Sequence, residues 1–176
     1  TAETTIVVPV YQRQYRWDIG GCEQLLADIR AVADTDDRRM HFIGSILSAT
    51  NGATTSGMGG DAAELVLIDG QQRITTLMLL VAALHHSAKD TDPGLAAELE
   101  RVLVLATDPD RTKLRPHRAW AQRFESVVLD RRSPDDALQD SRVDDKDAFF
   151  RSQIPADEGP RIWRGVRRLE HVAITL

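Results

Sequence analysis

The stretch that most constrains the fold of this chain is an apolar strand pattern that runs straight into a polar turn and then into an apolar helix pattern. The strand pattern covers residues 65–68 and the helix pattern covers residues 74–84. The turn between them consists of Asp69, Gly70, Gln71, Gln72 and Arg73. A buried helix that begins here presents free backbone N–H groups and a partial positive charge. The sequence therefore predicts an anion site, above all for a phosphate, at this turn.

The turn also has a purely structural interpretation. Asp69 could cap the helix, and the side chain of Gln72, three residues later, could bond back to the backbone N–H of Asp69 in a variant of the capping box. Asp-Gly is also a common turn dipeptide. Capping does not explain Arg73, because a cap needs no guanidinium at the start of the helix. The residues of the turn alone leave both interpretations open.

A second polar cluster lies near the start of the chain. It holds both tyrosines of the sequence and one of its three tryptophans, interleaved with arginine and glutamine: Tyr11, Gln12, Arg13, Gln14, Tyr15, Arg16 and Trp17. Aromatic rings beside guanidinium groups can stack a base and hold a phosphate. The same rings could instead be half-buried packing residues beside solvated arginines, and the cluster alone does not decide between the two.

A nucleotide site needs more than the turn can supply. Micromolar affinity corresponds to about 8 kcal/mol. A charge-assisted hydrogen bond contributes roughly 1.5–3 kcal/mol and a helix N-terminus roughly 0.3–1 kcal/mol. Arg73 and one helix end therefore fall short. We predict that residues 11–17 fold over the turn, where Arg13 would add charge and Tyr11 could stack on a base.

Composition bounds the class of protein. The 176 residues, 42% of them hydrophobic, suffice for one globular domain with a core. The net charge of −5 gives no global electrostatic footprint for nucleic acid, so any DNA contact would use a local patch. A single cysteine, no long uncharged apolar stretch and no signal peptide lead us to expect a cytoplasmic protein without membrane contact. The chain begins without Met and stops inside an apolar run, so we expect a fragment of a longer protein.

The expected elements indicate an α+β fold with a mixed sheet, because strands and helices do not alternate as in a doubly wound sheet. Asp18 and Pro160 are typical of helix starts, and residues 131–147 are so highly charged that we predict a surface loop. We predict strands at residues 6–8, 42–47, 64–68 and 112–115, and further helices from Gln72, over residues 95–105 and over residues 118–129.

Several residues outside the two clusters could carry function. The sequence has no P-loop, no zinc-type spacing of His and Cys, and no nucleophile elbow. We interpret Cys22 as a small packing residue and the pair His85-His86 as a helix cap rather than a metal site. Two basic groups could contact phosphates or could be solvated faces paired with acids: Arg161, Arg164 and Arg168, and Lys113, Arg115, Arg118 and Arg123.

Three blocks of sequence together resemble the N-terminal domain of GmrSD-type modification-dependent restriction enzymes. They are residues 8–17 (VPVYQRQYRW), residues 41–46 (HFIGSI) and residues 67–77 (LIDGQQRITTL), in the order and spacing of that family. The resemblance is strong over residues 6–90 and weak over residues 112–129. It implies a fold like that of ParB and sulfiredoxin, with a nucleotide-binding core at residues 1–110 and a helical extension at residues 111–176.

The resemblance also implies a function and a site. It implies binding and hydrolysis of a nucleoside triphosphate, GTP or another, with Mg²⁺, in the service of DNA restriction. Carried over by the match, Asp69, Gln72 and Arg73 are the expected catalytic residues, and Asp69 is also a candidate magnesium ligand. The expected nucleotide-binding residues are Gly70, Gln71, Arg13, Tyr11 and Gln12, of which the last three could instead sense modified DNA.

In that family the nuclease lies in a separate C-terminal region with an HNH-like motif, in cis or in trans. No His-Asn-His set occurs in this sequence, so we expect that this chain alone does not cleave DNA. The alternative to a hydrolysing domain is a binding module that senses modified DNA without turnover and controls the nuclease.

Overall fold

A computed structural model of the protein describes residues 4–7, 18–34, 41–50, 63–69, 71–116, 120–131 and 139–175. Strands and helices follow one another without regular alternation, which confirms the α+β class. The elements are β1 (Thr4–Val7), α1 (Ile19–Asp34), β2 (His41–Thr50), β3 (Ala63–Asp69), α2 (Gln71–Ala88), α3 (Pro93–Leu103), β4 (Leu114–Arg115), α4 (Ala121–Val128), α5 (Ser141–Gln153), the 3-10 turn η1 (Ala156–Glu158), α6 (Gly159–Arg167) and β5 (Leu169–Thr175).

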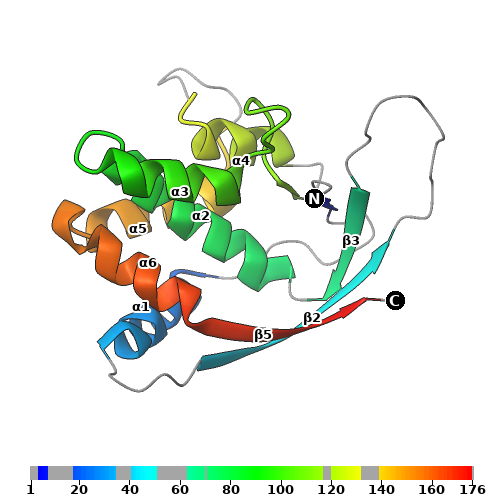
Figure 1. Ribbon diagram of the computed structural model, residues 1–176, viewed down its shortest axis with the longest axis horizontal. Helices are drawn as coiled ribbons and strands as arrows, with labels where there is room; N and C mark the ends of the chain where they lie inside the picture. Colours follow the sequence, from blue (N-terminus) through cyan, green and yellow to red (C-terminus); the bar gives the residue numbers. More distant parts are fainter. Residues whose placement is uncertain are drawn as a thin grey trace.

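The sheet is mixed, and across the described strands its order is β4-β1-β3-β2-β5. Strand β1 is parallel to both of its neighbours, β3 and β4. Strand β2 is antiparallel to β3 and parallel to β5. Figure 1 shows β2 and β5 side by side along one flank of the helical body, with α6 leading into β5. The strands predicted at residues 42–47 and 64–68 are confirmed as parts of β2 and β3.

Helix α2 is the centre of the helical body. It contacts α3, α4, α5 and α6. A helix that is surrounded in this way needs apolar residues on all sides, and residues 79–84 of α2 are all buried. Its side chains pack with fully buried groups from the other helices, among them Leu99, Phe124, Phe150 and Ile162.

The prediction of a surface loop over residues 131–147 is wrong for its second half. Helix α5 begins at Ser141, after Asp140, whose side chain accepts a hydrogen bond of 2.9 Å from the backbone N–H of Arg142. The charges misled the prediction because two of them are buried. Lys146 and Asp147 lie on the same inner side of α5 as Val143 and Phe150.

Those two buried charges have polar partners. The ammonium of Lys146 donates to the carbonyl of Arg142 over 2.9 Å, and Asp147 accepts from Arg151 over 3.0 Å. Burial lowers the pKa of Lys146 below its ordinary value. A charged segment can therefore form an interior helix when each buried charge is satisfied.

Helices α1 and α6 cross closely at a glycine. A Cβ atom on Gly165 would stand 2.4 Å from the carbonyl oxygen of Ile29 and 2.7 Å from its Cγ2 atom. Arg168, just after α6, donates to the carbonyl of Val32 over 3.0 Å and so satisfies an end of α1. The predicted helix start at Pro160 is confirmed, because Pro160 is the second residue of α6, and β5 follows directly after this helix, at Leu169.

Candidate functional site

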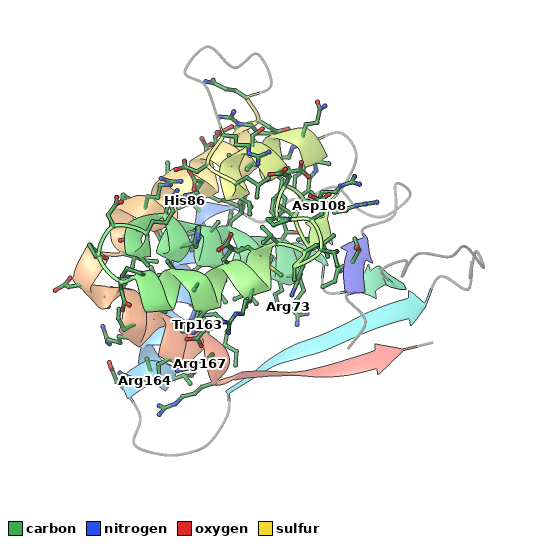
Figure 2. All side chains as sticks on the ribbon, turned by 45° about the horizontal axis from the view of Figure 1, so that its top comes forward. Arg73, His86, Asp108, Trp163, Arg164 and Arg167 are labelled. Carbon is green, nitrogen blue, oxygen red and sulfur yellow. The ribbon has the colours of Figure 1, made fainter. Side chains whose placement is uncertain are left out.

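The predicted strand–turn–helix is present at residues 63–88. Strand β3 ends at Asp69 and α2 begins at Gln71, so a buried helix starts directly after the sheet. Arg73 lies half-buried in the first turn of α2. Figure 2 places it at the end of α2 nearest the sheet. Gly70 and the side chains of Asp69, Gln71 and Gln72 lie outside the described residues, so their predicted roles stay predictions.

Three parallel strands end at one edge of the sheet beside this junction. Val7, the last residue of β1, is in register with Val66 of β3 on one side and with Arg115 of β4 on the other. Strand β3 continues for three more residues, about 10 Å, before α2 begins. The carboxyl ends of β1, β3 and β4 therefore share the edge from which α2 starts.

The aromatic and basic cluster at residues 11–17 follows β1 in the chain. It lies outside the described residues, as do Tyr11, Gln12 and Arg13 within it. The parallel register shows only that the chain leaves β1 at Val7, at the edge that β3 and α2 share. That Arg13 and Arg73 form one pocket stays a prediction.

The basic row of α6 is largely engaged in contacts within the chain. Arg161 donates to Asp34 of α1 over 2.8 Å and also pairs with Glu158. This hydrogen bond from Arg161 lowers the pKa of Asp34. Arg168 bonds to a carbonyl of α1, as described above. The row therefore joins α6 to α1, which confirms for Arg161 the interpretation of a face paired with acids.

The second basic stretch is also divided between structural contacts and the sheet edge. Arg123 is buried in α4 and binds both carboxylate oxygens of Asp144 over 2.9 and 3.0 Å. The ammonium of Lys113 donates to the carbonyl of Arg101 over 2.5 Å. Arg115 lies at the carboxyl end of β4, and Arg118 lies outside the described residues.

The interpretation of His85 and His86 as a helix cap is wrong for His86. Its Nε2 atom lies 3.0 Å from the carbonyl oxygen of Val127, in the last turn of α4, so the ring N–H donates to a different helix. Burial lowers the pKa of His85, and it lowers that of His86 to about 4, so both rings are neutral near pH 7. No group of three or more metal-binding side chains occurs in the described part of the chain.

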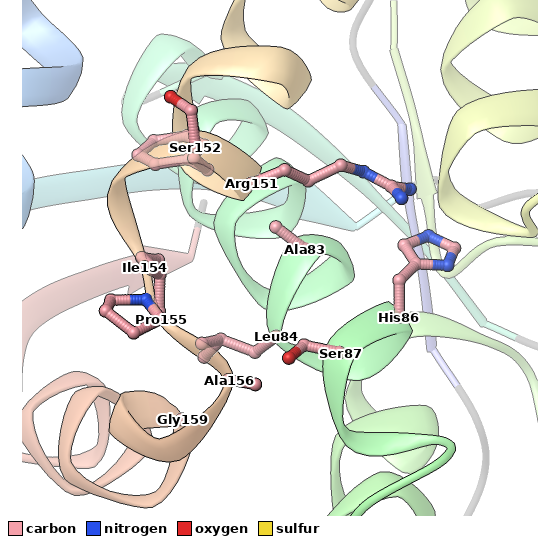
Figure 3. A pocket seen from close by; sticks show the side chains of 11 residues that line it. Ala83, Leu84, His86, Ser87, Arg151, Ser152, Ile154, Pro155, Ala156 and Gly159 are labelled. Carbon is pink, nitrogen blue, oxygen red and sulfur yellow. The ribbon is translucent and has the colours of Figure 1, made fainter.

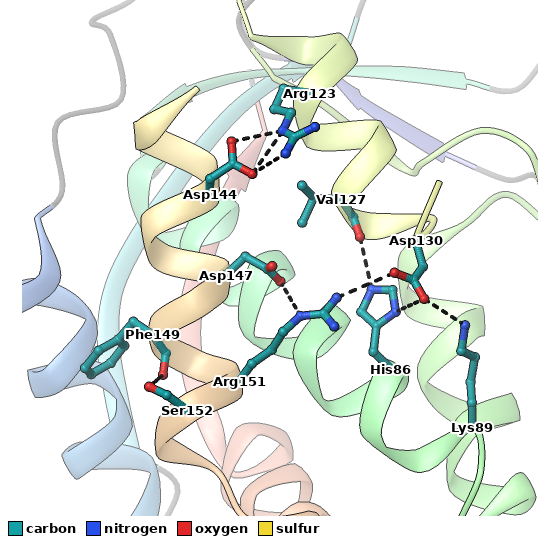
Figure 4. A network of polar contacts seen from close by, with 10 residues as sticks. All are labelled: His86, Lys89, Arg123, Val127, Asp130, Asp144, Asp147, Phe149, Arg151 and Ser152. Atoms are coloured by element: carbon teal, nitrogen blue, oxygen red, sulfur yellow. Dashed lines mark hydrogen bonds and ion pairs between the residues drawn. The ribbon is translucent and has the colours of Figure 1, made fainter. Parts of the chain in front are cut away.

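His86 belongs to a polar network that the sequence did not reveal. Its Nδ1 atom lies 3.4 Å from a carboxylate oxygen of Asp130. The same carboxylate lies 3.3 Å from Lys89 and 3.9 Å from Arg151, which is held by Asp147 (Figure 4). Asp130 has a φ of 56°, a left-handed conformation that aspartate and asparagine adopt more often than most other non-glycine residues. The network joins α2, α4 and α5 around the Asp130 carboxylate.

A cavity of about 450 Å³ lies toward the other end of α2 from Arg73. It is lined by residues of α2, α5 and η1, including Leu84, His86 and Arg151 (Figure 3). The nearest lining residue of α2, Ala83, lies ten positions beyond Arg73, about 15 Å along the helix. The cavity is therefore separate from the candidate anion site.

Cys22 is confirmed as a packing residue. Its side chain is completely buried in α1. Burial raises the pKa of the thiol to about 11, so almost none of it is thiolate at neutral pH. A nucleophilic role for Cys22 does not fit this environment.

In the ranges that the structure describes, no helix is long and apolar enough to span a bilayer.

Comparison with known proteins agrees with this picture. None of the curated proteins matches the sequence. Residues 1–171 match the family described as the GmrSD restriction endonuclease, N-terminal domain. The match covers both the β3–α2 junction and the cluster that follows β1, and it confirms the resemblance of the three sequence blocks. The chain therefore belongs to the GmrSD restriction endonuclease N-terminal domain family and is a component of a DNA restriction system.

Proposed function

We propose that the carboxyl edge of β1 and β3 binds a nucleoside triphosphate. The observation that carries the proposal is the parallel register of β1 and β3. Because the two strands are parallel, both end at the edge of the sheet where α2 begins. Open sheets commonly bind ligands outside the carboxyl ends of their strands. The N-terminus of α2 adds free N–H groups for a phosphate. Arg73, in the first turn of α2, adds a guanidinium.

The side chains then divide the work. Arg73 and the backbone N–H groups of residues 70–72 hold the phosphates. Arg13 adds a second cation, Gln12 donates hydrogen bonds, and Tyr11 stacks on the base. Asp69 and Gln72 orient the attacking water. Hydrolysis would then rest mainly on positioning and on charge stabilisation, as in other phosphoryl-transfer sites.

Magnesium fits this site only together with the nucleotide. The described part of the chain holds no group of three potential metal ligands. Asp69 at the end of β3 would supply one carboxylate, and phosphate oxygens and water would supply the remaining ligands that Mg²⁺ requires. When bound, the ion neutralises phosphate charge. The protein's own contribution is to hold Asp69 next to the start of α2.

The architecture supports a finer fold proposal. We propose that the sheet and its first helices form a ParB- and sulfiredoxin-like core at residues 1–110, with residues 111–176 as its extension. The extension also adds β4 and β5 to the same sheet, beside β1 and β2. Because both parts contribute strands to one sheet, we propose that they form a single domain. An experimental structure compared with ParB would test the assignment.

Nucleotide turnover is tested by phosphate release. The wild type is incubated with each of the four ribonucleoside triphosphates and Mg²⁺, beside Arg73→Ala and the control Arg164→Ala. Arg164 is an exposed arginine of α6, so the control removes the same charge away from the sheet edge. We expect release from the wild type and the control and a loss of at least tenfold in Arg73→Ala. Equal rates in all three proteins would refute the assigned role of Arg73.

A second function is a sensor of modified DNA without turnover. The family match supports DNA and a nuclease region as partners of the full-length protein, in cis or in trans. We propose that the protein acts in the cytoplasm. The sensor hypothesis predicts salt-dependent DNA binding that nucleotide does not alter, because phosphate contacts release counterions. Binding to modified and unmodified duplexes is measured at two salt concentrations. Absence of binding at low salt excludes the sensor role.

A further inference from the structure

We propose that the cavity between α2, α5 and η1 binds a small organic anion, with a carboxylate on Arg151 and an apolar body against Leu84 and Ile154. The cavity has a volume of about 450 Å³, within the range of roughly 300–1,000 Å³ that small-molecule sites occupy. It lies about 15 Å along α2 from Arg73, so the inference is independent of the proposed nucleotide site.

The wall that would receive the apolar body is already built by the core. The side chains of Leu84 in α2, Phe150 in α5 and Ile154 just after α5 line the cavity, and all three are buried. They belong to the hydrophobic cluster that joins the helices. Because core packing fixes these side chains, the cavity does not have to be assembled when a ligand arrives. An apolar body placed against them would remove further apolar surface from water.

Arg151 supplies a charge at one end of the cavity. Its Nε atom donates to Asp147 over 3.0 Å, and its side chain remains 32% exposed, so a ligand can reach it. The Nη2 atom has no hydrogen-bond partner in the described part of the chain, because the nearby oxygen of Asp130 lies 3.9 Å away. Asp147 therefore orients the guanidinium and leaves its outer N–H groups for another acceptor. A carboxylate has the two oxygens that such a fork binds.

The acids that balance Arg151 lie outside the cavity. Asp147 is 1% exposed, and the carboxylate of Asp130 also faces Lys89 at 3.3 Å. Neither acid lines the cavity, whereas Arg151 and the neighbouring ring of His86 do (Figure 3). His86 is neutral near pH 7, because burial lowers its pKa to about 4. Of the described residues that line the cavity, Arg151 is therefore the one that carries a full charge.

The adjoining surface fixes the orientation of the ligand. Leu84 and Ser87 line both the cavity and a second hollow of about 200 Å³. Asp92 and Asp157 line this second hollow, and no lysine or arginine of the described residues does. A carboxylate would be repelled there, so it should bind at the end of the cavity that holds Arg151.

The ends of two helices oppose an anion only weakly. Helices α2 and α5 both end beside the cavity, and a helix C-terminus carries a partial negative charge. Donors within the chain satisfy carbonyl groups in both last turns: Thr91 donates to Ser87 over 3.1 Å, Ser152 to Phe149 over 2.8 Å and Arg30 to Gln153 over 2.8 Å. The guanidinium of Arg151 carries a full charge and would contact the carboxylate directly, so it outweighs these partial charges.

The test is titration of isotope-labelled protein with cinnamate and with the neutral cinnamamide, followed by NMR of the backbone amides. The two probes share one apolar body and differ in the carboxylate. We expect saturable shifts at Ser87 and Arg151, with a Kd below about 1 mM for cinnamate and at least tenfold higher for cinnamamide. Arg151→Gln should weaken cinnamate binding at least tenfold and leave cinnamamide binding unchanged.

The matched control is Arg142→Gln. Arg142 lies on the same helix, pairs with Asp140 and has a side chain that is 32% exposed, like that of Arg151. It does not line the cavity, so this variant should bind both probes as the wild type does. Arg151→Lys keeps the charge beside Asp147 and should retain more cinnamate binding than Arg151→Gln. A thermal melt of each protein checks that it is folded.

Ser87→Trp tests the site without removing a charge. Ser87 lines the cavity from α2, so an indole at this position should fill it and abolish binding of both probes. Equal affinity of the wild type for the two probes, or cinnamate binding that Arg151→Gln leaves unchanged, would overturn the role of Arg151. The comparison of probes in the wild type decides the same point if Arg151→Gln does not fold. Absence of saturable shifts, or binding that survives in Ser87→Trp, would overturn the cavity as a ligand site.

Discussion

Replacement of Gly165 by alanine should destabilise the protein, although alanine is the better helix former. Gly165 lies in α6 where the helix crosses α1. Its added Cβ would stand 2.4 Å from the carbonyl oxygen of Ile29, whereas an ordinary contact begins at 3.4 Å. The two backbones would have to separate by the difference of these values, about 1 Å. The carbonyl cannot rotate away, because it belongs to the backbone of α1.

The expected loss follows from two opposing effects. Alanine in a helix interior gains about 1 kcal/mol over glycine. Overpacking of a well-packed contact costs about 1–3 kcal/mol, and a clash with backbone belongs at the upper end. The net effect is a loss of about 2 kcal/mol, or about 4–8 °C in Tm for a protein of this size. The separation would also stretch the bonds from Arg161 to Asp34 and from Arg168 to Val32.

Two other glycines in helices supply matched controls. A Cβ on Gly94 would lie 3.6 Å from the Asp92 carboxylate, and one on Gly159 would lie 3.7 Å from Leu95, both ordinary contacts. Gly94→Ala and Gly159→Ala should therefore be neutral or stabilising by up to about 1 kcal/mol. Urea unfolding followed by circular dichroism gives the free energy of unfolding for all three variants. If Gly165→Ala is as stable as its controls, the close crossing of α1 and α6 is not real.

Three further predictions concern buried polar groups. Burial lowers the pKa of His86 from 6.5 to about 4. Between these two pH values His86 is therefore protonated in the unfolded chain and neutral in the folded protein. The free energy of unfolding should fall from pH 6.5 to pH 4 by up to about 3 kcal/mol. In urea titrations His86→Gln should make the free energy of unfolding less dependent on pH. The same pH dependence in His86→Gln as in the wild type would contradict the lowered pKa of His86. Arg123→Ala leaves Asp144 without its bidentate partner and should lower the free energy of unfolding by about 3 kcal/mol in the same assay. A loss below about 0.5 kcal/mol would show that the pair contributes no more than an exposed ion pair, which is worth about 0.2–1 kcal/mol. Cys22 should resist alkylation at pH 8 in the folded protein and react promptly in urea, because burial raises the pKa of its thiol to about 11; fast reaction of the native protein would disprove the buried position.

Sequence reasoning succeeded where the signal is local. The junction of β3 and α2 follows from an apolar run of strand length, a Gly-containing turn and an apolar run of helix length, all within about twenty residues. The cap by Asp18 is equally local, and its carboxylate accepts from the N–H of Gly21 over 3.0 Å. Periodicity and turn chemistry are properties of neighbouring residues, so one sequence suffices to find them.

It failed where the deciding partner lies far away in the chain. Arg161 could not be assigned to an ion pair, because its partner Asp34 lies 127 positions earlier. The start of α5 was missed because Lys146 and Asp147 look like exposed charges until it is known that helices from distant parts of the chain pack against α5. The pairing of β1 with both β3 and β4 also joins distant segments. That pairing is the part of the candidate site that no local pattern contains.

The position of the proposed site on α2 bears on how a bound nucleotide would act on the protein. Arg73 lies in the first turn of a helix that is buried along residues 79–84 and contacts four other helices. A ligand held at this end binds an element that is part of the core, so it should bind the folded protein and not the unfolded chain. Occupancy at about 100 times the Kd would therefore stabilise the whole folded unit by about 2.7 kcal/mol.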